Sequence, residues 1–182
     1  MRYRAAKTSL LAALLCVPLR AQEFSQHRPP SVKMAPTRVT NVTRGKPGNV
    51  TLHFEVESGY HVNSNTPTAE FLIPTSLKLT APTDIVIGRI TYPKGQEMTF
   101  EFAPDEKLSV YSGGFDIGVV IRPLVGVVAA RYAVRGQLKY QACDKAACYP
   151  PKQLPVDFGI QVLKGPPSTG RKNPAQSPHI HR

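Results

Sequence analysis

The sequence predicts an all-β protein built as an antiparallel β-sandwich. Apolar residues repeat with a period of two over several short segments, as expected for strands that bury one face. Turn-forming residues separate these segments, and no window shows a sustained helical repeat with caps. Several short strands at this spacing are typical of an immunoglobulin-like sandwich.

The expected strands follow one another along the chain, and each is justified by its own alternation. They cover residues 50–56, 85–87, 117–121, 132–140 and 156–162. Turn signals lie between them at residues 58–59, 81–84, 93–95 and 112–114, where glycine, proline and aspartate gather. The chain has no tryptophan, so its likeness to antibody domains is architectural only.

The first 21 residues have the features of a signal peptide. Arg2, Arg4 and Lys7 form a basic start, the apolar stretch runs from Ser9 to Leu19, and Ala21 is a small residue suited to cleavage. The stretch is shorter than the roughly 20 residues needed to span a bilayer. We therefore expect an exported, periplasmic protein that meets a membrane only indirectly, through a partner.

The distribution of charge sets the expected domain limits and argues against nucleic acid as a partner. Residues 22–35 are basic and rich in proline, so we expect a flexible segment there, and residues 164–182 should form a disordered basic tail. The folded unit is then 36–163. The formal net charge of +11 lies in the signal peptide and the two ends, while residues 50–163 are close to neutral. The body therefore lacks the basic face that nucleic-acid binding requires.

Two cysteines carry the only clear chemical signal. Removal of the signal peptide takes Cys16 away and leaves Cys143 and Cys148, an even number in an oxidising compartment, so we expect them to pair. Four residues separate them at a hairpin-like turn. Such a turn can bring the two α-carbons within the roughly 4.4 to 6.8 Å that a disulfide tolerates.

A disulfide across so short a loop contributes little to the stability of the fold. The loop-entropy model assigns it about 2 to 3 kcal/mol, less than a bridge between distant parts of the chain. A short, exposed loop favours exchange with other thiols, as a redox carrier requires. A plain structural disulfide in the hairpin remains the alternative on these grounds.

The segment 140–151, Tyr-Gln-Ala-Cys-Asp-Lys-Ala-Ala-Cys-Tyr-Pro-Pro, resembles the active-site segment of a known family. This family is the N-terminal periplasmic domain of the thiol:disulfide interchange protein DsbD. Residues 59–63, 92–95 and 108–111 also look like blocks of that family, so the resemblance covers about 36–163.

The resemblance implies an immunoglobulin-like domain with an activity of the protein-disulfide reductase type. A thioredoxin-like donor protein or domain would supply electrons, and the acceptors would be disulfide isomerases or thioredoxin-like proteins of cytochrome c maturation. Cys148 would form mixed disulfides with partners and Cys143 would resolve them. Thiolate attack on sulfur needs no metal and no organic cofactor.

The resemblance also implies which residues line the site and where the chain departs from the family. The expected lining residues are Tyr60, Tyr92, Tyr140, Tyr149 and Pro150. The segment Tyr92 to Gly95 would form a cap loop over the cysteines. The loop between the cysteines is one residue shorter than in the best-known member, and His61 and Asn63 stand where that member has tyrosines. The membrane-spanning and thioredoxin-like parts are missing, so we expect a stand-alone form that receives electrons from a separate protein.

Two other functions compete with this interpretation. The first is a secreted immunoglobulin-like binding module with a purely structural disulfide, for which the sandwich pattern alone would suffice. The second is a metal site that combines the two cysteines with His53 or His61. Both histidines are far from the cysteines in sequence, and a closed four-ligand zinc site is not indicated. Motifs for hydrolysis or phosphate binding are absent.

Overall fold

The computed structural model describes residues 31–165, and in this range the chain is all-β, as predicted. The strands are β1 (Val32–Met34), β2 (Thr40–Thr43), β3 (Gly48–Val56), β4 (His61–Asn63), β5 (Ser76–Thr80), β6 (Ile85–Thr91), β7 (Gln96–Phe100), β8 (Ala103–Tyr111), β9 (Gly114–Pro123), β10 (Arg131–Tyr140), β11 (Ala142–Cys143) and β12 (Lys152–Leu163). No helix among these residues has the length and apolar character that crossing a bilayer requires.

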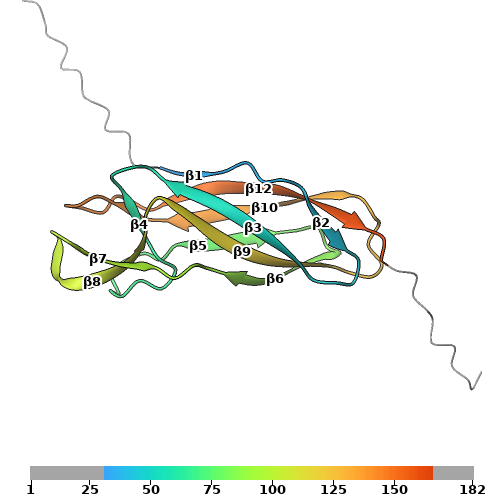
Figure 1. Cartoon of the computed structure of the whole chain (residues 1–182), viewed down its shortest axis with the longest axis horizontal. Coiled ribbons are helices and arrows are strands. Elements are labelled where there is room, and N and C mark those ends of the chain that lie inside the picture. Colours follow the sequence, from blue (N-terminus) through green and yellow to red (C-terminus); the bar gives the residue numbers. More distant parts are fainter. Residues whose placement is uncertain (1–30, 166–182) are drawn as a thin grey trace, which may run out of the picture.

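The strands form three four-stranded sheets. Two make the sandwich, with the orders β1-β3-β9-β6 and β2-β12-β10-β5. The third, β11-β4-β8-β7, lies at one end of the elongated molecule, on the left in Figure 1. All pairs are antiparallel except β2 with β12, which run parallel. The parallel pair departs from the expected antiparallel order because the chain crosses from β1 in one sheet to the edge of the other before it returns as β3.

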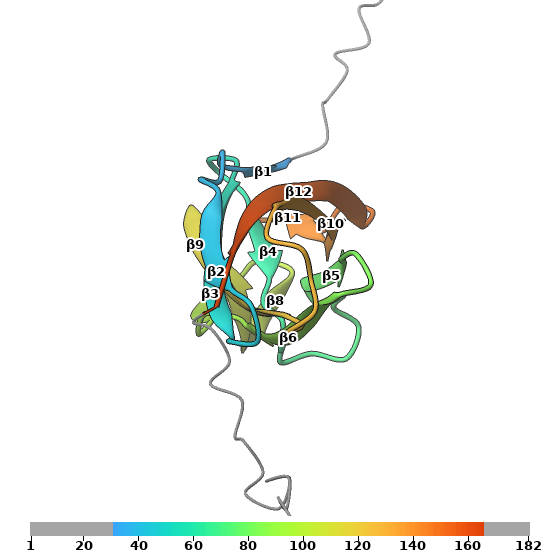
Figure 2. The same cartoon turned by 90° about the vertical axis from the view of Figure 1, so that its right-hand side faces the viewer.

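The main core lies between the two large sheets, and the predicted alternation produces it. Every second side chain of β3 is buried from Val50 to Val56, and β9 and β12 repeat the pattern. Leu52 and Phe54 come from one sheet, Leu138 and Ile160 from the other, and all four are fully buried. Figure 2 shows β3 and β9 on one side of this core and β10 and β12 on the other.

The predicted turns all lie between strands. Gly59 and Gly113 have φ values of 86° and 62°, in the left-handed region that favours glycine. Gly59 lies in the connection from β3 to β4, and Gly113 in the tight turn from β8 to β9. Both turns reverse the chain at the end of the molecule that carries the third sheet.

Residues before the expected start of the folded unit, residue 36, already form a strand. Strand β1 lies within the segment 22–35, which we expected to be flexible, and pairs with β3 through Lys33 and Glu55. Val32 is buried, and three residues are too few to show alternation in the sequence. The expected signal peptide, residues 22–30 and the tail from 166 to 182 lie outside the described residues.

The third sheet has two different faces. On one face Val62, Tyr111 and Ala142 close the end of the main core. The other face covers a second cluster of buried residues, formed by Ala69, Leu72, Phe100, Leu108 and Val110. Phe102, Ala103 and Cys148 pack against this second cluster. The cysteine pair therefore belongs to the end of the molecule and not to the sandwich core.

Truncation of the core should unfold the domain more readily than truncation at the surface. Phe54→Ala should lower the free energy of unfolding by about 3 to 5 kcal/mol, because it leaves a cavity beside Phe115, whose ring lies 5.5 Å from that of Phe54. Val128→Ala, at a side chain that is 70% exposed, is the control and should change it by less than about 0.5 kcal/mol. Urea unfolding of the oxidised protein measures both. Equal losses would contradict the assigned core.

Candidate functional site

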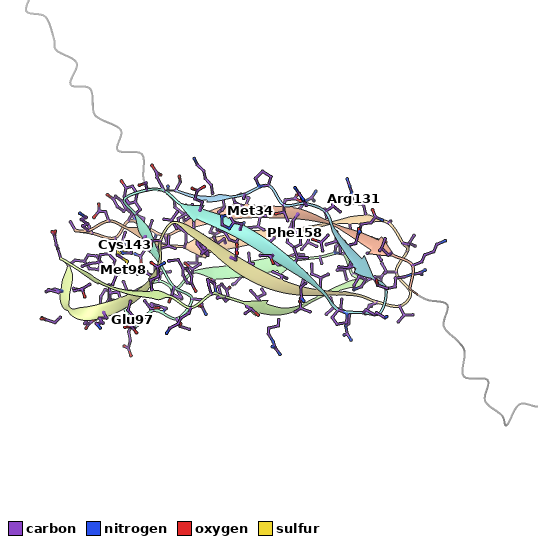
Figure 3. The ribbon with its side chains drawn as sticks, viewed as in Figure 1. Met34, Glu97, Met98, Arg131, Cys143 and Phe158 are labelled. Atoms are coloured by element: carbon purple, nitrogen blue, oxygen red, sulfur yellow. A yellow bond between two sulfur atoms is a disulfide. The ribbon has the colours of Figure 1, made fainter. Side chains whose placement is uncertain are left out.

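The site is the disulfide between Cys143 and Cys148, with an S–S distance of 2.03 Å. Cys143 ends β11, and Cys148 lies directly opposite it as an isolated antiparallel bridge. The α-carbons are 3.9 Å apart, closer than the roughly 4.4 to 6.8 Å that disulfides usually span. Figure 3 shows Cys143 in the part of the molecule that carries the third sheet.

The two sulfur-bearing residues differ in exposure. Cys143 is fully buried, with 0% of its surface exposed, whereas Cys148 is half-buried. Pro150 follows on the exposed surface. A protein that approaches this end of the molecule therefore meets Cys148 before Cys143.

Asp144 holds the loop between the cysteines in shape. Its Oδ1 accepts hydrogen bonds from the backbone N–H groups of Ala146 and Ala147, each at 2.8 Å. The Asp144 N–H donates to the carbonyl of Ala147 at 2.9 Å. An aspartate that binds the backbone two and three residues ahead is a common way to stabilise a tight turn. The loop is thus ordered by its first residue.

Two of the expected tyrosines meet at this loop. The Tyr149 hydroxyl donates to Oδ2 of Asp144 at 2.7 Å, and its ring lies edge-on to that of Tyr60 with centroids 6.0 Å apart. The hydrogen bond to Asp144, followed by burial, raises the pKa of Tyr149 to about 12. The phenol therefore stays protonated at neutral pH and remains a donor to the loop.

Gln141 ties the site to the neighbouring loop. Its Oε1 accepts from the side-chain amide of Asn63 and from the backbone N–H of Ile73, both at 3.1 Å. Its Nε2 donates to the carbonyl of Tyr149 at 3.3 Å. One side chain thus joins β4, the segment after it and the residue that follows Cys148.

Tyr140 and Tyr92 lie in the main core. The Tyr140 hydroxyl accepts from the N–H of Val32 at 3.3 Å, and the Tyr92 hydroxyl accepts from the N–H of Leu77 at 2.7 Å. Both rings pack with the main core and not with the second cluster. Of the expected lining residues, the structure therefore brings Tyr60 and Tyr149 together at the disulfide loop and leaves these two behind it.

The cover over the disulfide comes from a different segment than the one expected. Phe100 and Phe102, at the turn between β7 and β8, stack with centroids 5.5 Å apart and belong to the cluster that contacts Cys148. The expected cap, Tyr92 to Gly95, packs elsewhere: a side chain at Gly95 would collide with the hydroxyl of Ser109 and approach Ser64. The β7–β8 hairpin reaches the site through Phe100, which stacks on His61 of β4, the strand that pairs with β11.

His61, which the sequence offered only as a candidate metal ligand with the cysteines, lies next to Cys143 in the structure. It pairs with Cys143 in the β4–β11 register, is 4% exposed and stacks on Phe100 with centroids 3.9 Å apart. Burial lowers its pKa to about 4, partly offset by the charge of Asp144. The imidazole is therefore neutral at pH 7.

Phe100 and Phe102 were not predicted from the sequence, and neither was the pairing of His61 with Cys143. The run Met98-Thr99-Phe100-Glu101-Phe102 alternates apolar and polar residues, and this signal could have revealed a strand with an apolar face. Nothing in the sequence pairs His61 with Cys143, 82 positions apart. No group of three His, Cys, Asp or Glu side chains within residues 31–165 could hold a metal ion.

Comparison with known proteins identifies the family to which the chain belongs. The family model "Thiol:disulfide interchange protein DsbD, N-terminal" matches residues 30–158. The reduced N-terminal domain of DsbD from Neisseria meningitidis is 23% identical, over 62% of this chain and 78% of that chain, with a TM-score of 0.39. The same domain in complex with the PilB N-terminal domain is 24% identical, over 60% and 73%, with a TM-score of 0.38.

A type I cohesin from Pseudobacteroides cellulosolvens is also similar, at 11% identity over 72% of this chain and 92% of that chain, with a TM-score of 0.43. No curated protein matches the chain.

The buried His61 should make stability depend on pH. Its pKa in the folded state lies below the value of about 6.5 for an unfolded chain, so this contribution is complete above pH 6.5 and is lost as the pH falls toward 4. Between pH 7.5 and 4.5 the wild-type protein should lose about 2 to 3 kcal/mol more than His61→Phe, which cannot take up this proton.

Urea unfolding at the two pH values measures this difference. Val128→Ala, at a side chain that is 70% exposed and carries no titratable group, is the control and should lose as much as the wild type. An equal loss of unfolding free energy in the wild type and in His61→Phe would contradict a lowered pKa of His61 in the folded protein.

Proposed function

Because the chain belongs to the family of the N-terminal domain of the thiol:disulfide interchange protein DsbD, we propose that it is a periplasmic thiol-disulfide exchange domain. It would pass electrons from a thioredoxin-like donor to oxidised periplasmic proteins. The observation that carries this proposal is the Cys143–Cys148 disulfide at the end of the sandwich, with one sulfur-bearing residue buried and the other half-buried.

The difference in exposure supports different roles for the two cysteines. Exchange needs a thiolate to approach a disulfide sulfur directly, so access decides which sulfur is attacked. Cys148 is the accessible one and forms the mixed disulfide with the partner. Cys143, buried behind it, attacks Cys148 in turn and releases the partner.

Electrons and protons balance over the cycle. The donor dithiol gives two electrons and two protons to the Cys143–Cys148 disulfide and becomes a disulfide itself. The reduced pair then transfers the same electrons to the disulfide of an acceptor. The acceptors we expect are disulfide isomerases and thioredoxin-like proteins of cytochrome c maturation. No step requires a metal or an organic cofactor.

The β7–β8 hairpin would control access to Cys148. Phe100 is 8% exposed and lies in the cluster against which Cys148 packs. A partner sulfur must come within bonding distance of the Cys148 sulfur, so the aromatic tip has to move when the partner docks. The tip would thus protect the reduced thiols from unspecific oxidants.

Trapping with a thioredoxin probe tests the two roles. The probe is a thioredoxin whose resolving cysteine is replaced by serine and whose remaining cysteine carries a thionitrobenzoate group. Cys143→Ser should accumulate the mixed disulfide, because the Cys148 thiolate displaces thionitrobenzoate and nothing resolves the product. Cys148→Ser should form little, because its remaining thiol is buried. Gel electrophoresis without reductant measures both, and equal accumulation would contradict the assigned roles.

The reduction potential of the pair separates exchange from a structural role. Equilibration of the mature protein with glutathione or dithiothreitol buffers, followed by trapping of free thiols, should give a value between about −120 and −270 mV, the range of exchange proteins. A value well below about −300 mV would mean a structural disulfide. We would then adopt the function of a binding module.

A further inference from the structure

The face of the third sheet that carries the disulfide also carries two buried polar atoms without a partner. Among the described residues, these are the buried side-chain atoms Nε2 of His61 and Oδ1 of Asn63 that lack a hydrogen bond. Residues two apart on a strand point to the same side, so both side chains share one face of β4. An unsatisfied buried polar atom lowers the stability of a fold by about 1 to 3 kcal/mol. The presence of His61 at this position therefore calls for an explanation.

The register places the free nitrogen beside the buried cysteine. His61 and Cys143 are direct partners in the β4–β11 pair, and the β-carbons of such partners lie about 4.5 to 5.5 Å apart on the same face. The ring is held by its stack on Phe100, which leaves it little freedom to turn away. In this register the His61 imidazole and the Cys143 thiol of the reduced protein are neighbouring side chains on one face of the sheet.

We propose that His61 is the general base for Cys143, taking the proton of the Cys143 thiol through Nε2 when Cys143 resolves a mixed disulfide on Cys148. This role rests on the proposed exchange function and adds a residue to it. Cys143 needs such help because it is fully buried, and an apolar environment disfavours the thiolate that must attack.

The step is balanced as follows. A bond forms between the sulfurs of Cys143 and Cys148, and the bond between Cys148 and the partner sulfur breaks. The cysteine pair loses two electrons to the partner. The proton of Cys143 moves to Nε2 of His61 and then to the departing thiolate, so the histidine is neutral at the beginning and at the end. In the reverse direction the same nitrogen returns the proton to Cys143.

The charges around His61 fit this role. The imidazole is neutral at pH 7, since burial lowers its pKa, and it can therefore accept a proton. Asp144 is the charged group that acts on it and favours the protonated form. On β8, Tyr111 faces the main core, and the charged side chains of β7 and β8 are exposed. As the thiolate forms beside the ring, its charge adds to that of Asp144 in stabilising the imidazolium.

Ring closure after reaction with oxidised glutathione tests the proposal. Reduced mature protein reacts first at Cys148 to give a mixed disulfide with glutathione, and Cys143 then closes the ring and releases glutathione. Acid quenching and mass spectrometry follow the two steps separately. His61→Phe keeps an aromatic ring against Phe100 but has no nitrogen, and it should slow ring closure at pH 6 about 100-fold while leaving the first step unchanged.

The pH profile distinguishes a base from a structural residue. Wild-type ring closure should change little between about pH 5 and 7, because His61 is neutral there. In His61→Phe the rate should rise about tenfold per pH unit, because it follows the ionisation of the thiol alone. His53→Phe is the matched control and should keep the wild-type rate and profile. His61→Gln, which has no titratable nitrogen and suits a polar site, serves if the phenylalanine variant does not fold.

A wild-type rate and profile in both His61 variants would overturn the role of His61. Glutathione has no protein surface, so this measurement does not depend on recognition of a partner. If thioredoxin is not trapped although ring closure with glutathione is normal, the result would count against the proposed electron relay. It would not count against the role of His61.

Discussion

The site depends on the pairing of β4 with β11 and β8, because this small ladder separates two apolar regions. One face of β4 presents Val62 to the main core, and the other presents His61, which is paired with Cys143, and Asn63. The pleat of a strand enforces this division, since neighbouring side chains point to opposite sides. The sandwich can therefore be packed for stability on one side while the other side keeps polar, reactive groups.

The same ladder makes the two cysteines unequal. Cys143 belongs to β11, is paired with His61 and is buried, whereas Cys148 lies across the turn, is half-buried and packs against the second cluster. Asp144 fixes the four-residue loop between them through two backbone hydrogen bonds. A rigid loop keeps the resolving sulfur close to the attacked sulfur. Proximity of this kind favours ring closure over escape of a mixed disulfide.

The strands and the reactive pair were predictable because their signals are local. Alternation marks β3, β9, β10 and β12, and glycine-containing turns such as that at Gly113 separate them. The disulfide followed from the number of cysteines and their spacing. The exceptions are equally instructive: β1 is too short to show alternation, and its ordering at Val32 comes from pairing with β3. The parallel pairing of β2 with β12 joins segments that are far apart in the sequence, so no local pattern reveals it.

The surroundings of the disulfide were only partly predictable. The rings of Tyr60 and Tyr149 meet edge-on, while Tyr140 lies in the main core and Tyr92 packs against it. The expected cap at 92–95 was wrong, because the covering aromatic rings, Phe100 and Phe102, lie at the tip of the following hairpin. How far a hairpin extends, and toward which neighbour it bends, depends on packing that a one-dimensional pattern does not encode.

By itself, the sequence determined that this protein is an all-β sandwich with two cysteines joined across a short turn, since period-two alternation and chain spacing are local properties. Only the tertiary structure decided that Cys143 is buried and Cys148 partly accessible, that Cys148 packs against the cluster containing Phe100, and that His61 stands opposite Cys143. These features arise from the register of strands that are distant in the chain, and register is set by the packing of both faces of the sheet at once.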